Sequence, residues 1–359
     1  MQNTALLLEI MRLIYCLLAL MATTSTSYVL AADSSKPAAP EKKLPSMFAQ
    51  PKKKTSADQL AYAASLRDTG KNQEAARQYS ALVHKWSSSP EAPTAQLEYA
   101  RLLEKKGDYA DAFEEYEYLI HNYTGSFQYS DILESEFRIA NCIMTTRLKF
   151  LGILPGSAGY ETALPLFEKI VLNGPEWSGT PQAQFNIGWI NEQIKSYDLA
   201  AAAYEMVQQN YPKSKFAATA AFRQGACLYQ ISRERPNEER SLQVLRTHLQ
   251  KILRNYPDHE LASEAAAYLD EVSRQLADIT YDRALFYDKG ASPKAALIAY
   301  TDFVRKFPDS AKAKRARIRI EQLETGTGKI PASQPDAKLR AATQQKPRPH
   351  AAISGQKEK

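Results

Sequence analysis

The stretch AALIAYTDFVRKFPDS, Ala295 to Ser310, places aromatic residues four and eleven positions after a small apolar residue and follows them with proline. This spacing recurs five more times along the chain. The other copies are Ala75, Tyr79 and Trp86; Ala112, Tyr116 and Tyr123; Ala163, Phe167 and Gly174; Ala200, Tyr204 and Tyr211; and Leu245, Leu249 and Tyr256. A pattern that repeats along a chain indicates a repeat architecture before any single site is considered.

A second pattern lies upstream of each copy, an apolar residue followed three positions later by a small one. The pairs are Leu60 and Ala63, Leu97 and Ala100, Phe137 and Ala140, Phe185 and Gly188, Phe222 and Gly225, and Tyr281 and Ala284. Both spacings place residues on one helical face, and Gly70, Gly107 and Gly290 fall between the two patterns, where a helix should end. Each unit is therefore predicted to be a helix A, a short turn and a helix B. Units three and five carry longer connections, which we interpret as loop insertions.

The spacing, with Pro212, Pro257 and Pro308 closing three helices B, resembles the tetratricopeptide repeat over residues 57–324. The predicted fold class is all-α, an α-solenoid of about six helix pairs in which each unit contacts only its neighbours. The helix A of the last unit is predicted to run from about Leu261 to Lys289, and residues 311–324 to form a C-terminal capping helix. No run alternates with a period of two, so we predict no sheet.

The two ends of the chain differ from the repeats. Residues 1–32 contain a short apolar run with a small-residue exit, which is typical of a secretory signal peptide, and Met11 is an alternative start because Glu9 precedes the run. A retained membrane anchor is the other interpretation of this run. Residues 33–56 form a basic Pro, Ala and Lys linker, and residues 325–359 a polar basic tail predicted to be disordered.

Positive charge is concentrated in the linker and the tail. The linker has a net charge of +4 and the tail of +5, which leaves −3 for the repeats out of the total of +6. Such basic arms either keep the protein soluble or make peripheral contact with outer-membrane lipid or cell-wall polymers. Export makes nucleic acid an unexpected partner.

Catalytic and metal-binding motifs are not found in the sequence. The histidines stand singly, and there is no HExxH, CxxC, GxSxG or phosphate-binding loop. Cys142 and Cys227 lie on helices A two repeats apart, too far for a disulfide, and are interpreted as small apolar residues. We therefore predict no enzyme activity and no cofactor. The Gly-rich segment 151–160 is interpreted either as a plain loop insertion or as a partner-contact loop.

Positions of the tetratricopeptide pattern that usually face the groove select the candidate site. This assignment is implied by the resemblance, and it names Leu97, Arg101, Phe137, Asn141, Met144, Phe185, Trp189, Glu192, Phe222 and Tyr229 as a peptide- or partner-binding groove. Phe185 and Trp189 are helical neighbours on one face, suited to anchoring a peptide with aromatic side chains. The alternative is that these aromatic residues pack between helices.

Two stretches of the sequence indicate which family of tetratricopeptide proteins the chain resembles. Residues 268–310, with QLA in a long helix and FPDS after the last helix B, are similar to the later repeats of the BamD family of outer-membrane protein assembly factors, and residues 211–229 resemble its middle repeats. The resemblance implies a periplasmic scaffold whose aromatic groove, in units two to five, holds the C-terminal segments of β-barrel precursors. It also implies that the last unit and the cap dock β-barrel assembly subunits. BamD proteins are lipoproteins, whereas the only candidate Cys here, Cys16, follows the bulky Tyr15, so lipidation is not expected.

One rival assignment stays open. Periplasmic tetratricopeptide proteins of the cell-division or Tol-Pal type have similar Tyr-Pro repeat ends. That class usually carries an amino-terminal coiled coil, and residues 33–56 contain no heptads.

Overall fold

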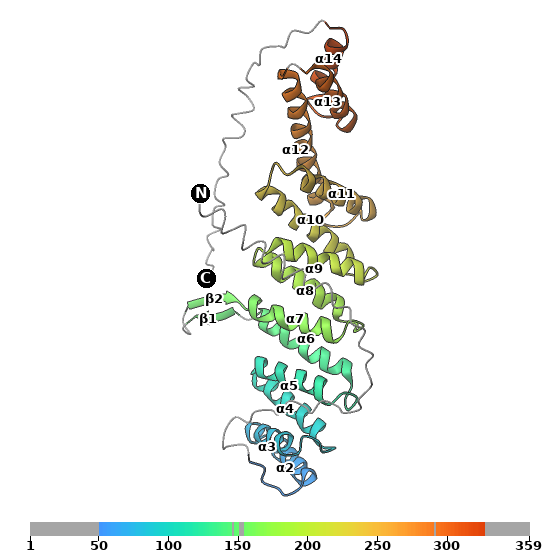
Figure 1. Ribbon diagram of the computed structural model, residues 1–359. Helices are drawn as coiled ribbons and strands as arrows, with labels where there is room; N and C mark the ends of the chain where they lie inside the picture. Colours follow the sequence, from blue (N-terminus) through green and yellow to red (C-terminus); the bar gives the residue numbers. More distant parts are fainter. Residues whose placement is uncertain (1–49, 146, 151–153, 291, 327–359) are drawn as a thin grey trace, which may run out of the picture. The chain divides into compact units, whose positions relative to one another are not determined.

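The computed structural model describes residues 50–145, 147–150, 154–290 and 292–326, and in these residues it contains six helix pairs followed by one final helix (Figure 1). The pairs are α2 (Ser56–Asp68) with α3 (Asn72–Lys85), α4 (Ala92–Lys106) with α5 (Tyr109–Asn122), α6 (Tyr129–Thr145) with α7 (Tyr160–Asn173), α8 (Thr180–Gln193) with α9 (Tyr197–Asn210), α10 (Ala217–Glu234) with α11 (Glu239–Asn255), and α12 (Ala262–Lys289) with α13 (Pro293–Lys306). The last helix is α14 (Ala313–Glu324). The predicted all-α repeat fold is confirmed. The predicted signal peptide, and most of the predicted linker and tail, lie outside the described residues.

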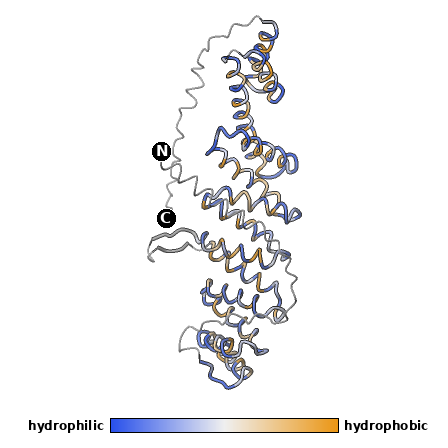
Figure 2. Tube along the Cα trace, in the orientation of Figure 1, coloured by the Kyte–Doolittle hydropathy of each residue, from blue (hydrophilic) through white to orange (hydrophobic). Residues whose placement is uncertain are grey.

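The two sequence patterns form the buried contact within each helix pair. The small residues of helices A and B, such as Ala63, Ala75 and Ala100, have no exposed surface, and the helix-B aromatics Tyr79, Tyr116, Tyr204 and Tyr300 are at most 1% exposed. Gly188 of α8 shows why a small residue is needed, because a Cβ there would lie 2.7 Å from the ring of Tyr204. Figure 2 shows apolar residues recurring along the helices rather than gathered in one segment.

Glycine ends helix A in the first two units. Gly107 closes α4 with φ +90°, and Gly70 follows the end of α2 with φ +79°, a left-handed conformation that L side chains disfavour. Proline cannot donate a backbone hydrogen bond, and Pro212, Pro257 and Pro308 occupy the turns after α9, α11 and α13. Helix ends are therefore set by local sequence.

A polar bridge links consecutive units in three places. A helix-B tyrosine donates to an acid twelve residues earlier on helix A, and the same acid accepts from an arginine on the next helix A or on α14. The members are Tyr116, Glu104 and Arg138; Tyr204, Glu192 and Arg223; and Tyr300, Asp288 and Arg319. Each bridge joins two units through charge-assisted hydrogen bonds, which are stronger than neutral ones. The bond of Arg319 is buried, that of Arg223 is half-buried and that of Arg138 is exposed.

The prediction of no sheet is wrong for the insertion of the third unit. Strands β1 (Arg147–Phe150) and β2 (Leu154–Ala158) form an antiparallel hairpin between α6 and α7, with Phe150 opposite Leu154. The four residues of β1 are too few for a period of two to stand out from the sequence. The pairing of β1 with β2 gives hydrogen-bond partners to backbone N–H and C=O groups that are not part of a helix.

The remaining predictions about the helical region follow the observed elements. The long helix A of the last unit is confirmed as α12, of 28 residues, and the capping helix as α14. Among the described residues Cys142 and Cys227 form no disulfide; Cys227 is buried, as predicted, and Cys142 is half-buried.

Candidate functional site

A groove of about 400 Å³ opens on the helix-A side of units four to six. It is bounded by the end of α8, the turn into α9, the middle of α10 and the first turns of α12, and we call it the α8–α10–α12 groove. Its lining residues are Glu192, Gln193, Lys195, Tyr197, Phe222, Arg223, Ala226, Cys227, Gln230, Leu261, Glu264, Ala265 and Tyr268. Two of the predicted site residues, Glu192 and Phe222, belong to it.

Small side chains help to make room for the groove. Ala226 of α10 and Ala265 of α12 both line it, between the larger side chains of the two helices. The chain reaches α12 through the turn at Tyr256 and Pro257, which begins the helix at Ala262 beside α10. The turn at Tyr256 and Pro257 and the small side chains of Ala226 and Ala265 therefore both contribute to the groove.

One wall of the groove is polar and its shape is fixed by a bridge. Arg223 Nη1 lies 2.9 Å from Glu192 Oε1, and the Tyr204 hydroxyl donates to the other oxygen of that carboxylate at 2.8 Å. Burial raises the pKa of Tyr204 far above its ordinary value, with the Glu192 carboxylate adding to the shift, so the phenol stays neutral and keeps donating. Glu192, predicted as a groove residue, therefore both lines the groove and joins units four and five.

Aromatic residues form another part of the groove lining. The Tyr229 and Tyr268 rings stack with centroids 4.1 Å apart, so the predicted Tyr229 supports a lining residue. Phe222 is 3% exposed and stacks on His259 with centroids 4.5 Å apart. The Tyr268 hydroxyl donates to Glu264. Phe222 is therefore part of the packed base of the groove, and the half-buried Tyr268 and Leu261 keep apolar surface for a ligand.

Cys227 does not give the groove a reactive thiol. Burial raises its pKa to about 12, with the Glu192 carboxylate as the second cause. The thiolate is the nucleophilic and metal-binding form, and it is absent at neutral pH. Among the described residues no group of three or more His, Cys, Asp or Glu side chains could hold a metal ion.

The remaining predicted residues lie outside this groove, on α4, α6 and α8. Phe137 packs edge-on against Phe167 and Trp177, with centroids 5.8 and 5.6 Å away. Asn141 donates to the Phe137 carbonyl and accepts from Asn186, so its amide joins α6 to α8. Both side chains are half-buried.

Phe185 and Trp189 share α8 but have separate neighbours. Phe185 packs against Tyr204 and Phe216, with centroids 5.3 and 5.5 Å away, whereas Trp189 meets Tyr160 edge-on at 5.3 Å. Both are half-buried, so part of each ring contacts the interior and part is accessible.

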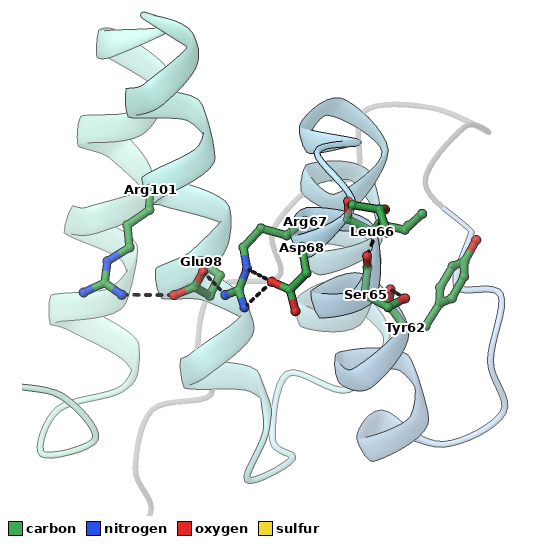
Figure 3. Close-up of polar contacts among 8 residues, drawn as sticks. Tyr62, Ser65, Leu66, Arg67, Asp68, Glu98 and Arg101 are labelled. Carbon is green, nitrogen blue, oxygen red and sulfur yellow. Dashed lines mark hydrogen bonds and ion pairs between the residues drawn. The ribbon is translucent and has the colours of Figure 1, made fainter.

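Leu97 and Arg101 lie on α4. Leu97 packs against the core of units two to four, and Met144 of α6, also selected by the repeat pattern, packs against the same core. Arg101 is about half exposed and lies 3.0 Å from Glu98, which also pairs with Arg67 of α2 (Figure 3). The structure thus places the predicted residues on helices A but gathers only Glu192, Phe222 and, behind Tyr268, Tyr229 around one groove.

Sequence reasoning missed Lys195, Leu261, Glu264 and Tyr268. Lys195 has φ +63° and stands seven residues after the small Gly188, the offset at which Gly70 and Gly107 follow Ala63 and Ala100. A lysine in a glycine position was a signal present in the sequence. The α12 residues carried no comparable signal, because they reach the groove through the packing of one unit on the next.

Comparisons with known proteins agree with the repeat fold. The YfiO family model, described as an outer membrane lipoprotein, matches residues 153–335, and a tetratricopeptide repeat model matches residues 60–127. No curated protein matches the chain. In the part of the chain that the structure describes, no helix is long and apolar enough to cross a membrane.

Similar solved structures include two tetratricopeptide proteins. One, from Parabacteroides merdae, is 14% identical, with 75% of this chain and 98% of that chain covered and a TM-score of 0.30. YrrB, described as a tetratricopeptide protein with an unusual peptide-binding site, is 19% identical, with 59% and 92% covered and a TM-score of 0.30.

Proposed function

The chain belongs to the YfiO family of outer membrane lipoproteins, and from that premise we propose that it is a protein-binding scaffold of the bacterial envelope that acts in the assembly of outer-membrane β-barrel proteins. The observation that carries this proposal is the span of the family match, residues 153–335, which includes the whole α8–α10–α12 groove, the last unit and α14. The first two units match a general repeat model.

The groove is the proposed site for an unfolded precursor. An extended segment needs an apolar surface for its side chains and polar groups for its main chain. The half-buried Tyr268 and Leu261 supply the first, and the amides of Gln193 and Gln230 supply the second. The last unit and α14 are the proposed docking surface for a β-barrel assembly subunit, by position in the family.

The proposed location is the periplasm, at the inner face of the outer membrane, after export by the amino-terminal segment. The family description names a lipoprotein, but Tyr15 precedes Cys16 where a small residue is expected. We therefore expect attachment through partners or the basic arms. Metabolic labelling with an alkyne fatty acid tests this, because a labelled protein that loses its label in Cys16→Ser would show lipidation.

Site-specific photocrosslinking in intact envelopes tests the function. A photoreactive residue at Gln193 probes the groove, one at Lys314 probes α14, and one at Ala202, exposed on α9 and outside the groove, is the matched control. We expect Gln193 to capture unfolded barrel precursors and Lys314 to capture a barrel-assembly subunit. Capture of cell-wall or Tol-Pal proteins at both positions would replace the proposal with the rival one, and capture no greater than at Ala202 would reject it.

A further inference from the structure

Lys195 combines an unfavourable backbone with a place on the groove. Among the described residues it is the only one other than glycine with a positive φ, +63°; the others are Gly70, Gly107, Gly125 and Gly326. The side chain of an L residue crowds its own backbone in this left-handed region, whereas glycine enters it freely. Non-glycine residues in such conformations cluster at functional sites, where an interaction requires the side chain.

Lys195 is also the cation of the groove whose charge is not neutralised. Arg223 is held by Glu192, and the nearby Glu264 accepts the Tyr268 hydroxyl. Lys195 is exposed and makes no ion pair with any residue that the structure describes. Its only described hydrogen bond is through its backbone, whose N–H donates to the Glu192 carbonyl at 3.0 Å.

The neighbours of Lys195 define what its ammonium group would meet. Tyr197 and Tyr268 provide aromatic surface, and Gln193 and Gln230 provide amides that can pair with a peptide main chain. An ammonium group is a compact charge on a flexible stem, and in a peptide segment the anionic side chains that it can pair with are those of Asp and Glu. A free chain end would also supply a carboxylate, and peptides with blocked and free ends separate it from an acidic side chain.

We propose that Lys195 is a specificity-determining residue of the groove, which selects extended segments that carry an Asp or Glu side chain near an aromatic one. This inference rests on the proposed function, since it names the chemistry of the segment that the scaffold holds. The left-handed backbone at Lys195 then destabilises the fold slightly, and the lysine side chain in return makes acidic segments bind more tightly than neutral ones. Specificity is such a difference between two affinities.

Fluorescence anisotropy with three twelve-residue peptides tests the proposal on the full chain. All three carry a central Tyr. The first has Asp two residues after the Tyr and blocked ends, and the second has Asn at that position and blocked ends. The third has Asn at that position and a free carboxyl end. We expect the wild-type protein to bind the Asp peptide about fivefold more tightly than the Asn peptide at low salt, because one partly exposed ion pair contributes an affinity difference of about that size. The third peptide should bind like the second.

Three variants separate recognition from structure. Lys195→Gly should lose the preference for Asp without losing stability, because glycine adopts φ +63° readily. Lys195→Arg should keep the preference, and Lys105→Gln, which removes an exposed lysine of α4, should leave it unchanged.

Four results would overturn the proposal: no preference in the wild type, no binding of any peptide, equal losses for the Asp and Asn peptides in Lys195→Gly, or a preference for the free carboxyl end. The envelope crosslink at Gln193 separates this failure from that of the proposed function. Capture of precursors there, without an acid preference, would reject the role of Lys195 alone.

Discussion

Arg319 of α14 donates two parallel hydrogen bonds to Asp288 of α12, from Nε to Oδ2 at 2.7 Å and from Nη2 to Oδ1 at 2.8 Å. Both side chains are less than 10% exposed, and the Tyr300 hydroxyl donates to the same carboxylate. Here the inter-unit bridge fixes the capping helix onto the last unit, at the end proposed to dock a partner.

Arg319→Ala should destabilise the C-terminal unit by about 3–5 kcal/mol, because removing one partner leaves a buried charge unpaired. Hydrogen exchange of α13 and α14 amides measures this locally, and urea unfolding measures it globally. Lys314→Ala, on the exposed face of α14, is the control and should change stability by about 0.5 kcal/mol or less. Equal effects of the two variants would contradict the assigned role of the pair.

Acid should weaken the same pair. The Arg319 guanidinium holds the pKa of Asp288 below its ordinary value of 3.8. For a lowered pKa, the stabilisation is complete above the unfolded value and is lost as the pH falls through the folded value. Protection of α14 amides should therefore be constant from pH 5 to 7 and fall below pH 4 in the wild type, whereas Arg319→Ala should lack this acid-dependent step.

Glu136→Gln should raise stability at alkaline pH. Glu136 has no exposed surface and stands four residues before the small Ala140. In three other units the equivalent residue of helix A is a glutamine whose side-chain amide donates to a helix-B carbonyl: Gln59, Gln96 and Gln184. Burial raises the pKa of Glu136 to about 9, with the Glu117 carboxylate as the second cause. The protonated acid thus takes the place of an amide.

The sign of the pH dependence follows from that raised pKa. Between the ordinary value of 4.5 and about 9, the folded state keeps a proton that the unfolded state releases, so the unfolding free energy falls as the pH rises. Urea unfolding at pH 8 should find Glu136→Gln more stable than the wild type by about 1–3 kcal/mol, with the difference closing near pH 4.5. Glu134→Gln, an exposed neighbour, should show neither effect; a less stable Glu136→Gln at pH 8 would refute the assignment.

Gly188→Ala and Gly225→Ala should differ although they change equivalent positions. A Cβ at Gly188 would lie 2.7 Å from two atoms of the Tyr204 ring, whereas at Gly225 the nearest atom is Leu249 Cδ2 at 3.1 Å, the end of a flexible side chain. We expect losses of about 1–3 kcal/mol for Gly188→Ala and of about 1 kcal/mol or less for Gly225→Ala. Thermal unfolding of the two variants checks the order, and the reverse order would show that helix approach is not limited by that ring.

The bridge of the first unit has its charges exchanged, with Arg67 on α2 and Glu98 on α4 at 2.6 Å (Figure 3). Arg67→Glu alone should cost about 1 kcal/mol, because the new carboxylate would face Glu98. Adding Glu98→Arg should recover only part of that loss, since it restores the inter-unit pair in the acid-then-arginine order but removes the pair of Glu98 with Arg101. A double-mutant cycle by urea unfolding measures the coupling, and zero coupling would mean that the pair is only a surface contact.

The sequence by itself determined the repeat architecture. Spacings such as Ala296 to Tyr300, glycines such as Gly107 and prolines such as Pro308 act on residues within one or two helical turns, so their consequences can be derived without knowing the fold. The helix pairs, the length of α12 and the cap were accessible for this reason.

Only the tertiary structure decided which residues share a site. Lys195 and Tyr268 lie 73 positions apart in sequence yet line one groove, and Phe137, chosen by the same repeat positions as Phe222, packs elsewhere. The physical reason is that local periodicity gives the face of a helix, whereas the space beside that face depends on how the next unit packs. The hairpin, the buried Glu136 and the charge bridges likewise depend on contacts between units, which no single helix encodes.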